Sequence, residues 1–170
     1  SALFPALSRM FGGGEKDKFL ENVESSVKHI IFWTIPATIL FVVLRAQIVR
    51  VAYGAGEFGW DATRLTAALL ALFVVSSVAQ SLVVMFVRSY YASGNTKKPL
   101  FINILSFTSI IILALFLNVI YQKFDFVAYF LEALLKVSNI RGTGVLILPI
   151  AYSIGSFINL VLFWQAFQLD

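Results

Sequence analysis

The sequence predicts an all-α integral membrane protein, with four transmembrane helices and short interfacial helices between them. Three observations lead to this fold class: 59% of the 170 residues are hydrophobic, only 13% are charged, and the mean hydropathy is +0.87. Soluble domains are about 45–50% apolar and about 25% charged. A soluble core of this size could not hide so much apolar surface, so the excess must face lipid.

The composition also excludes several classes of function. The chain has no cysteine and a single histidine, His29, so a thiolate nucleophile, a zinc site and a Ser/His/Asp arrangement are not expected. The 13 Lys and Arg residues are scattered over loops, as in membrane proteins, and do not form the patch that nucleic acid requires. We therefore predict a protein that is not an enzyme, with no cofactor, no metal and no nucleic-acid partner.

Residues 1–28 are predicted to form the end of a preceding helix, a flexible break at Gly12–Gly14, and a cytoplasmic linker with a surface helix. The opening of the chain in the middle of an apolar pattern suggests a piece of a longer protein. Between Glu15 and Val27, spacings of three and four place four apolar residues on one face: Phe19, Leu20, Val23 and Val27. This segment is either a helix lying against the membrane or a solvated linker helix.

Residues 29–170 are predicted to form a four-span membrane domain. The spans lie at about 27–44, 65–87, 101–121 and 145–167, and the last three contain no charged residue. Each is close to the roughly 20 residues that a membrane helix needs. Pro36 removes a backbone hydrogen bond within the first span and predicts a kink. Asp61 is the expected N-cap of the second helix.

A further apolar stretch, at about 126–135, is predicted to lie in the membrane interface. It is too short to cross, and Asp125, Glu132 and Lys136 crowd it. The loop 88–99 is basic, with Arg88, Lys97 and Lys98 and no acid. Because short loops rich in Lys and Arg stay on the cytoplasmic side, we expect this loop to be cytoplasmic.

Polar residues recur at helical spacing in the spans and are the candidate interior residues. They form one group in each of the last three spans: Ser77, Gln80 and Ser81; Asn103, Ser106 and Ser109; Tyr152, Gly155, Ser156 and Asn159. Such faces turn away from lipid because an unpaired polar group in hydrocarbon is costly. They serve either helix–helix packing or a polar pathway for a solute. The last three spans lack the ionisable groups that proton- or ion-coupled pumps generally use.

Four segments in order resemble the second half of the MurJ (MviN) lipid II flippase family. They are Ala2-Leu3-Phe4-Pro5-Ala6-Leu7-Ser8-Arg9, the stretch from Ile48 to Phe58, the stretch from Arg88 to Pro99, and Ala151-Tyr152-Ser153-Ile154-Gly155 with Asn159. The third is the strongest, because it matches the pattern R-x-F-Y-A-x-x-D-T-K-T-P. Its matching residues are Arg88, Tyr91, Asn95 in place of Asp, Thr96 and Pro99.

The resemblance implies a helical bundle of the multidrug/oligosaccharidyl-lipid/polysaccharide (MOP) exporter type, with fourteen helices in two lobes. This chain would supply about helices nine to twelve of the C-terminal lobe. The implied activity is the movement of an undecaprenyl-diphosphate-linked peptidoglycan precursor from the inner to the outer leaflet of the bacterial inner membrane, by alternating access. The implied partners are this precursor, membrane lipids and the missing N-terminal half.

The resemblance leaves the residues that bind substrate unknown, because the family's essential arginines precede Ser1. Some relatives bind sodium between their late helices, but Ile110 stands where many of them have Asn, and it offers no oxygen ligand. Two alternatives to the flippase stay open. One is a related exporter of another lipid-linked glycan or a drug, and the other is a four-helix membrane scaffold without transport.

Overall fold

The computed structural model describes residues 16–53, 59–123, 125–137, 140 and 142–169. The predicted helix end and glycine break in residues 1–15, and residues 54–58 of the second resembling segment, lie outside them. The elements are α2 (Lys16–Val43), α3 (Arg45–Tyr53), α4 (Trp60–Ala92), α5 (Lys97–Lys123), α6 (Asp125–Leu135), the 3-10 turn η1 (Thr143–Leu146) and α7 (Ile147–Gln168). The described part of the chain is helical and contains no strand.

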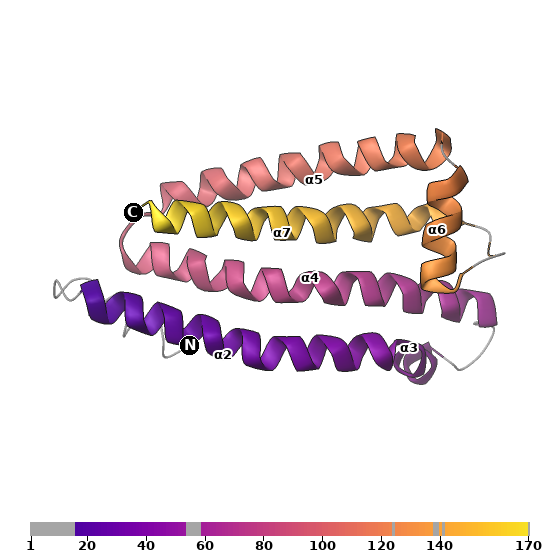
Figure 1. Cartoon of the computed structure of the whole chain (residues 1–170), viewed down its shortest axis with the longest axis horizontal. Coiled ribbons are helices and arrows are strands. Elements are labelled where there is room, and N and C mark those ends of the chain that lie inside the picture. Colours follow the sequence, from indigo (N-terminus) through magenta and orange to yellow (C-terminus); the bar gives the residue numbers. More distant parts are fainter. Residues whose placement is uncertain (1–15, 54–58, 124, 138–139, 141, 170) are drawn as a thin grey trace.

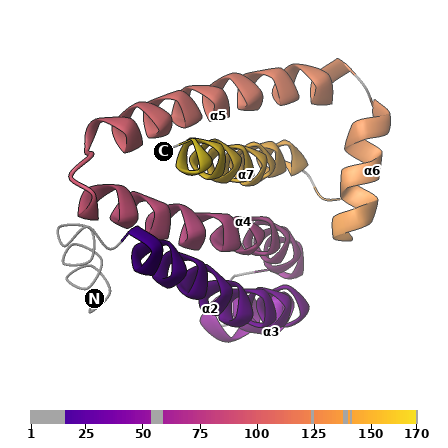
Figure 2. The ribbon, with the colours of Figure 1, turned by 60° about the vertical axis from the view of Figure 1, so that its left-hand side comes forward.

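Four long helices lie side by side, with α7 between α4 and α5 and with α2 on the other side of α4 (Figures 1 and 2). Each is long and apolar enough to cross a membrane: Asp17–Val43, Trp60–Ala92, Lys97–Lys123 and Thr143–Gln168. The predicted fold class, all-α with four spans, is therefore confirmed. Although α4 and α5 are consecutive in the sequence, both pack mainly on α7 and barely touch one another.

Between α4 and α7 the core is aromatic toward the turn that follows α4. Phe86, Tyr90 and Phe163 are buried there. The ring centroid of Phe86 lies 5.9 Å from that of Trp164, and the centroids of Tyr90 and Phe163 lie 6.2 Å apart. Edge-on and tilted contacts of this kind add about 0.5–1.5 kcal/mol per pair to the area buried. This cluster fixes the rotation of α4 against α7.

Helix α2 joins two elements that the sequence analysis kept apart, the surface helix and the first span. No Gly or Pro interrupts residues 16–35, and Glu24 pairs with Lys28 one turn later at 2.7 Å. Phe19 and Val23 are buried against Met85 of α4. The apolar face that suggested contact with the membrane surface therefore covers α4, and Leu20 lies outside that contact.

The chain changes direction at Leu44, between the end of α2 and the start of α3. Helix α2 continues through Pro36, whereas α3 lies across the end of the bundle (Figure 1). Backbone hydrogen bonds of 2.9 Å, from Leu44 to Leu40 and from Ile48 to Leu44, span this junction. The guanidinium of Arg50 then lies 5.6 Å from the centre of the Trp60 ring, which connects α3 to the start of α4.

Helix α4 begins at Trp60, and its N-cap is Gly59, without a side-chain hydrogen bond. The expectation that Asp61 is the N-cap was therefore wrong. Asp61 lies in the first turn of the helix. Because its side chain is already beyond the cap position, it acts only through its negative charge near the positive end of the helix dipole.

Helix α6 also lies across the end of the bundle, roughly perpendicular to α5 and α7 (Figure 1). With 11 residues it is too short to cross a membrane. Its outer surface exposes Phe126, Tyr129 and Phe130. Arg64 of α4 donates a hydrogen bond to the carbonyl of Lys136, just beyond the helix. A cation at a helix C-terminus is favourable, so this bond stabilises α6 in its position.

The close contact of α5 with α7 depends on Gly155. This glycine is buried, and a Cβ at its position would overlap the side chain of Ile110, whose Cδ1 would be 3.0 Å away. Small residues at such points let membrane helices approach closely. Ile110, which offers no oxygen ligand to an ion, thus packs against Gly155.

We expect Gly155→Ala to destabilise the protein by about 1–3 kcal/mol, the usual cost of overpacking. Thermal unfolding in detergent measures the effect. Gly144→Ala is the matched control, because a Cβ there would meet only Tyr121 at an ordinary 3.8 Å. In an Ile110→Ala background the cost of Gly155→Ala should fall. An equal cost in both backgrounds would contradict the contact.

The two ends of the bundle allow a test of orientation. Thr96 follows the turn after α4 and Lys123 ends α5 at the opposite end, and both side chains are exposed. With cysteines introduced singly in a background free of other cysteines, a membrane-impermeant thiol reagent should label Lys123→Cys but not Thr96→Cys in intact cells. The reverse pattern would place the loop 88–99 outside the cytoplasm.

Candidate functional site

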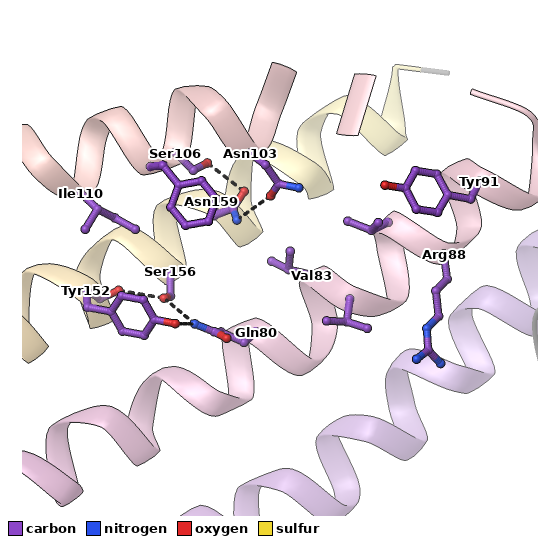
Figure 3. A pocket seen from close by; sticks show the side chains of 13 residues that line it. Gln80, Val83, Arg88, Tyr91, Asn103, Ser106, Ile110, Tyr152, Ser156 and Asn159 are labelled. Atoms are coloured by element: carbon purple, nitrogen blue, oxygen red, sulfur yellow. Dashed lines mark hydrogen bonds between the residues drawn. The ribbon is translucent and has the colours of Figure 1, made fainter. Parts of the chain in front are cut away.

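A pocket of about 520 Å³ lies between α4 and α5, with α7 behind it (Figure 3). It exists because the two helices diverge from one another while both pack on α7. Its lining combines apolar side chains with a polar series along α7: Gln80, Val83, Val84, Val87, Arg88 and Tyr91 from α4; Asn103, Ser106, Phe107 and Ile110 from α5; Tyr152, Ser156 and Asn159 from α7.

The first polar cluster joins α4 to α7 through Gln80. Its Nε2 donates to the hydroxyl of Tyr152 and, at 3.5 Å, to Oγ of Ser156 (Figure 3). The hydroxyl of Ser156 donates in turn to the Tyr152 carbonyl at 2.7 Å. The Tyr152 ring meets Phe73 of α4 edge-on at 5.6 Å. One amide thus has its donors directed at α7 and not at lipid.

The second polar cluster joins α5 to α7 through Asn159. Ser106 donates to Oδ1 of Asn159 at 2.8 Å, and Nδ2 of Asn159 donates to Oδ1 of Asn103 at 3.3 Å (Figure 3). Ser106 is almost completely buried. Asn159 therefore uses both ends of its amide, the pattern expected where water is absent.

Of the predicted interior residues, the structure brings together Gln80, Tyr152, Ser156 and Asn159, with Asn103 and Ser106 from α5. Ser77 and Ser81 do not join them. Ser77 is exposed and donates to the Val74 carbonyl, and Ser81 donates to the Ser77 carbonyl. Ser109 likewise bonds within its own helix, to Leu105.

Near Gln80, the buried serine on α4 is Ser76, one turn before it along the helix. A step of one residue rotates a side chain by about 100° around a helix, so Ser76 faces α7 while Ser77 turns outward. Sequence analysis also missed Ser153, which donates to the Leu72 carbonyl at 2.7 Å. The sequence signals that could have indicated an interior position for Ser153 were its hydroxyl group and its place within the fourth span.

The predicted loop 88–99 is shorter in the structure, because residues 88–92 belong to α4 and residues 97–99 to α5, so that only residues 93–96 form the turn. The motif also provides one end of the pocket. Arg88 and Tyr91 line that end. The side-chain oxygen of Asn95 accepts a 3.3 Å hydrogen bond from the Lys98 amide, in the first turn of α5. Pro99 is buried and Thr96 is exposed. Asn95 therefore stabilises the start of α5 as an aspartate would, but without the charge.

A third polar cluster, which sequence analysis missed, lies at the end of the bundle where α6 crosses. Thr143 donates to Oε1 of Glu132 at 2.6 Å, and the hydroxyls of Thr143 and Tyr121 lie 2.8 Å apart. It connects α5, α6 and η1. Its three members are eleven residues apart along the chain, but they lie on three different elements. The periodicity of a single helix therefore does not indicate them.

The pocket offers neutral hydrogen bonds and one cation, Arg88. Within the described ranges, no group of three or more His, Asp or Glu side chains is placed to hold a metal ion. Ile110 contributes only hydrocarbon to the lining. The arrangement suits the packing of helices and the binding of a polar or anionic solute.

Residues 1–168 match the model of the protein family described as lipid II flippase MurJ. The chain belongs to the MurJ family. This membership confirms the resemblance inferred from the four segments. It also agrees with the predicted MOP-type exporter fold.

Curated relatives share the family name. The chain is 32% identical over 106 residues to a probable lipid II flippase MurJ of Bdellovibrio bacteriovorus, covering 62% of the chain and 20% of the relative. Its identity to the Rhizobium tropici relative is 30% over 98 residues, 58% of the chain and 18% of the relative. The Thermotoga maritima relative is 28% identical over 87 residues, 51% of the chain and 18% of the relative. The matched part thus spans about one fifth of these MurJ relatives. No solved structure gives a significant match.

Gln80→Leu and Tyr152→Phe should each lower stability by about 1 kcal/mol, because each leaves a polar partner without its hydrogen bond. The double variant should cost less than the sum of the two, since one interaction is removed twice. Thermal unfolding in detergent of the unaltered protein, the two single variants and the double variant measures these costs. Ser77→Ala is the control, because Ser77 contacts only its own helix and should cost little. Strict additivity would mean that the two side chains are not coupled.

Proposed function

We propose that this chain forms part of a flippase that moves an undecaprenyl-diphosphate-linked peptidoglycan precursor from the inner to the outer leaflet of the bacterial inner membrane. The observation that carries this proposal is the MurJ family match over residues 1–168. The four helices able to cross a membrane are in keeping with it. Transport of this kind needs a change in protein shape and no covalent step.

The contacts of α7 support a role for the chain as a part that moves against the rest of the transporter. Helix α7 is hydrogen-bonded to α4 through Gln80 and to α5 through Asn159. These bonds, with the Gly155 contact, favour movement of the three helices as one unit. We infer that the unit rocks against the remainder of the protein, which supplies most of the substrate contacts.

The neutral lining of the pocket supports a second feature of the proposal. Apart from Arg88 at one end, no lining residue carries a charge. A proton-coupled step through this pocket would require a group that titrates there. We therefore propose that any coupling ion acts on another part of the transporter.

A complementation assay tests the function. The complete gene product that contains this chain should restore growth to cells depleted of their own lipid II flippase. Asn159→Leu should impair growth, because it removes the bonds to both Ser106 and Asn103 of α5. The corresponding loss of stability is about 1 kcal/mol or more per bond.

Val161→Leu is the matched control, since Val161 lies on the same helix with its side chain exposed, and growth should be normal. Protein levels in the membrane are compared for all variants. Failure of the unaltered protein to complement, at a normal level in the membrane, would contradict the flippase proposal. Equal growth of the two variants would remove only the role given to Asn159.

A further inference from the structure

Unused hydrogen-bond donors gather at the end of the pocket formed by Arg88 and Tyr91. The hydroxyl of Tyr91 and the amide group of Asn103 point toward one another across this end (Figure 3). Asn103 uses its oxygen to accept from Asn159, and its nitrogen donates to no described residue. The side chains of Tyr91 and Arg88 likewise make no hydrogen bond or ion pair with the residues that the structure describes.

The opposite end of the pocket differs, because its donors are already used. The donors of Gln80, Ser156 and Ser106 are directed at protein oxygens. The end near the turn therefore offers donors, and its one charged group is a cation. That chemistry fits the oxygens of an anion, and Arg with neighbouring neutral donors is a common phosphate-binding combination.

The walls next to these donors are apolar. Val84, Val87 and Phe107 line the pocket, and the side chains of Val84 and Phe107 are exposed. Lys97 and Lys98 follow at the start of α5, and the loop 88–99 has no acid. A ligand that fits both features has an anionic head group and a hydrocarbon chain.

We propose that this end of the pocket binds an anionic membrane phospholipid. Its phosphodiester accepts from Arg88, Tyr91 and Asn103, and one acyl chain lies along Val84, Val87 and Phe107. Arg88 is exposed and its guanidinium is directed away from Tyr91 (Figure 3), so the proposal requires lipid binding to turn this side chain toward the phosphate. A phosphodiester carries one negative charge, which a single guanidinium balances, whereas a lipid diphosphate carries more. The site does not depend on the proposed transport function.

Binding is measured by native mass spectrometry of the complete protein in a neutral detergent. The probes are palmitoyl-oleoyl phosphatidylglycerol and its zwitterionic phosphatidylcholine counterpart. We expect tighter binding of phosphatidylglycerol. Arg88→Gln should reduce this preference about fivefold, the equivalent of roughly 1 kcal/mol for one basic residue at a membrane surface. Lys123→Gln, an exposed lysine at the opposite end of α5, should leave it unchanged.

Two further measurements test the acyl-chain wall and distinguish a phospholipid from a lipid diphosphate. Val84→Trp should weaken the binding of both lipids, because it fills the acyl-chain wall without altering charge. Farnesyl diphosphate should compete poorly with phosphatidylglycerol. Equal binding of the two phospholipids, an unaffected Arg88→Gln, or an equal loss in Lys123→Gln would each overturn the proposal. Strong competition by farnesyl diphosphate would overturn it in favour of a lipid diphosphate.

Discussion

Inside hydrocarbon a polar side chain must find its partner within the protein, and in this bundle α7 supplies the partners. Tyr152 and Ser156 satisfy the amide of Gln80 on one side, and Asn159 satisfies Ser106 and Asn103 on the other. In a soluble protein water competes for bonds of this kind, whereas hydrocarbon offers no competing partner. The position of α7 between α4 and α5 follows from this constraint, as does the pocket that α4 and α5 leave between them.

The pocket is therefore a consequence of connectivity as well as of chemistry. A short turn connects the end of α4 to the start of α5. Each helix nevertheless packs on the face of α7 that carries its hydrogen-bond partners. Aromatic packing around Phe86 and Phe163 secures one of these contacts, and the close approach at Gly155 secures the other. The two contacts use different physical means, so they need not respond equally to a change in lipid or temperature.

The four helices able to cross a membrane and the short helix α6 could be predicted because they depend on composition and length alone. Uncharged runs of about 20 residues have few alternatives to crossing a bilayer. The cost of an unpaired polar group in hydrocarbon predicts protein partners for Gln80 and Asn159. In the structure Gln80 bonds to α7 and Asn159 bonds to α5. Their individual partners could not be predicted, since a partner is set by the rotation of one helix against another. The choice between Ser76 and Ser77 shows this, because both are serines and only the first faces α7. The continuity of α2 was missed because charge suggested a boundary, although nothing in residues 16–35 breaks a helix.

Helices α3 and α6 both lie across the same end of the bundle (Figure 1). Their exposed side chains, Phe126 and Tyr129 of α6 among them, add to the width of the described bundle at that end. In the described part of the chain, this end of the bundle therefore takes up more area than the four long helices do alone. A membrane segment that is wider in one leaflet responds to the lateral pressure in that leaflet, where lipids pack more or less tightly around it. The shape of the surrounding lipids thus acts on the protein unequally from its two sides, even where they make no specific contact.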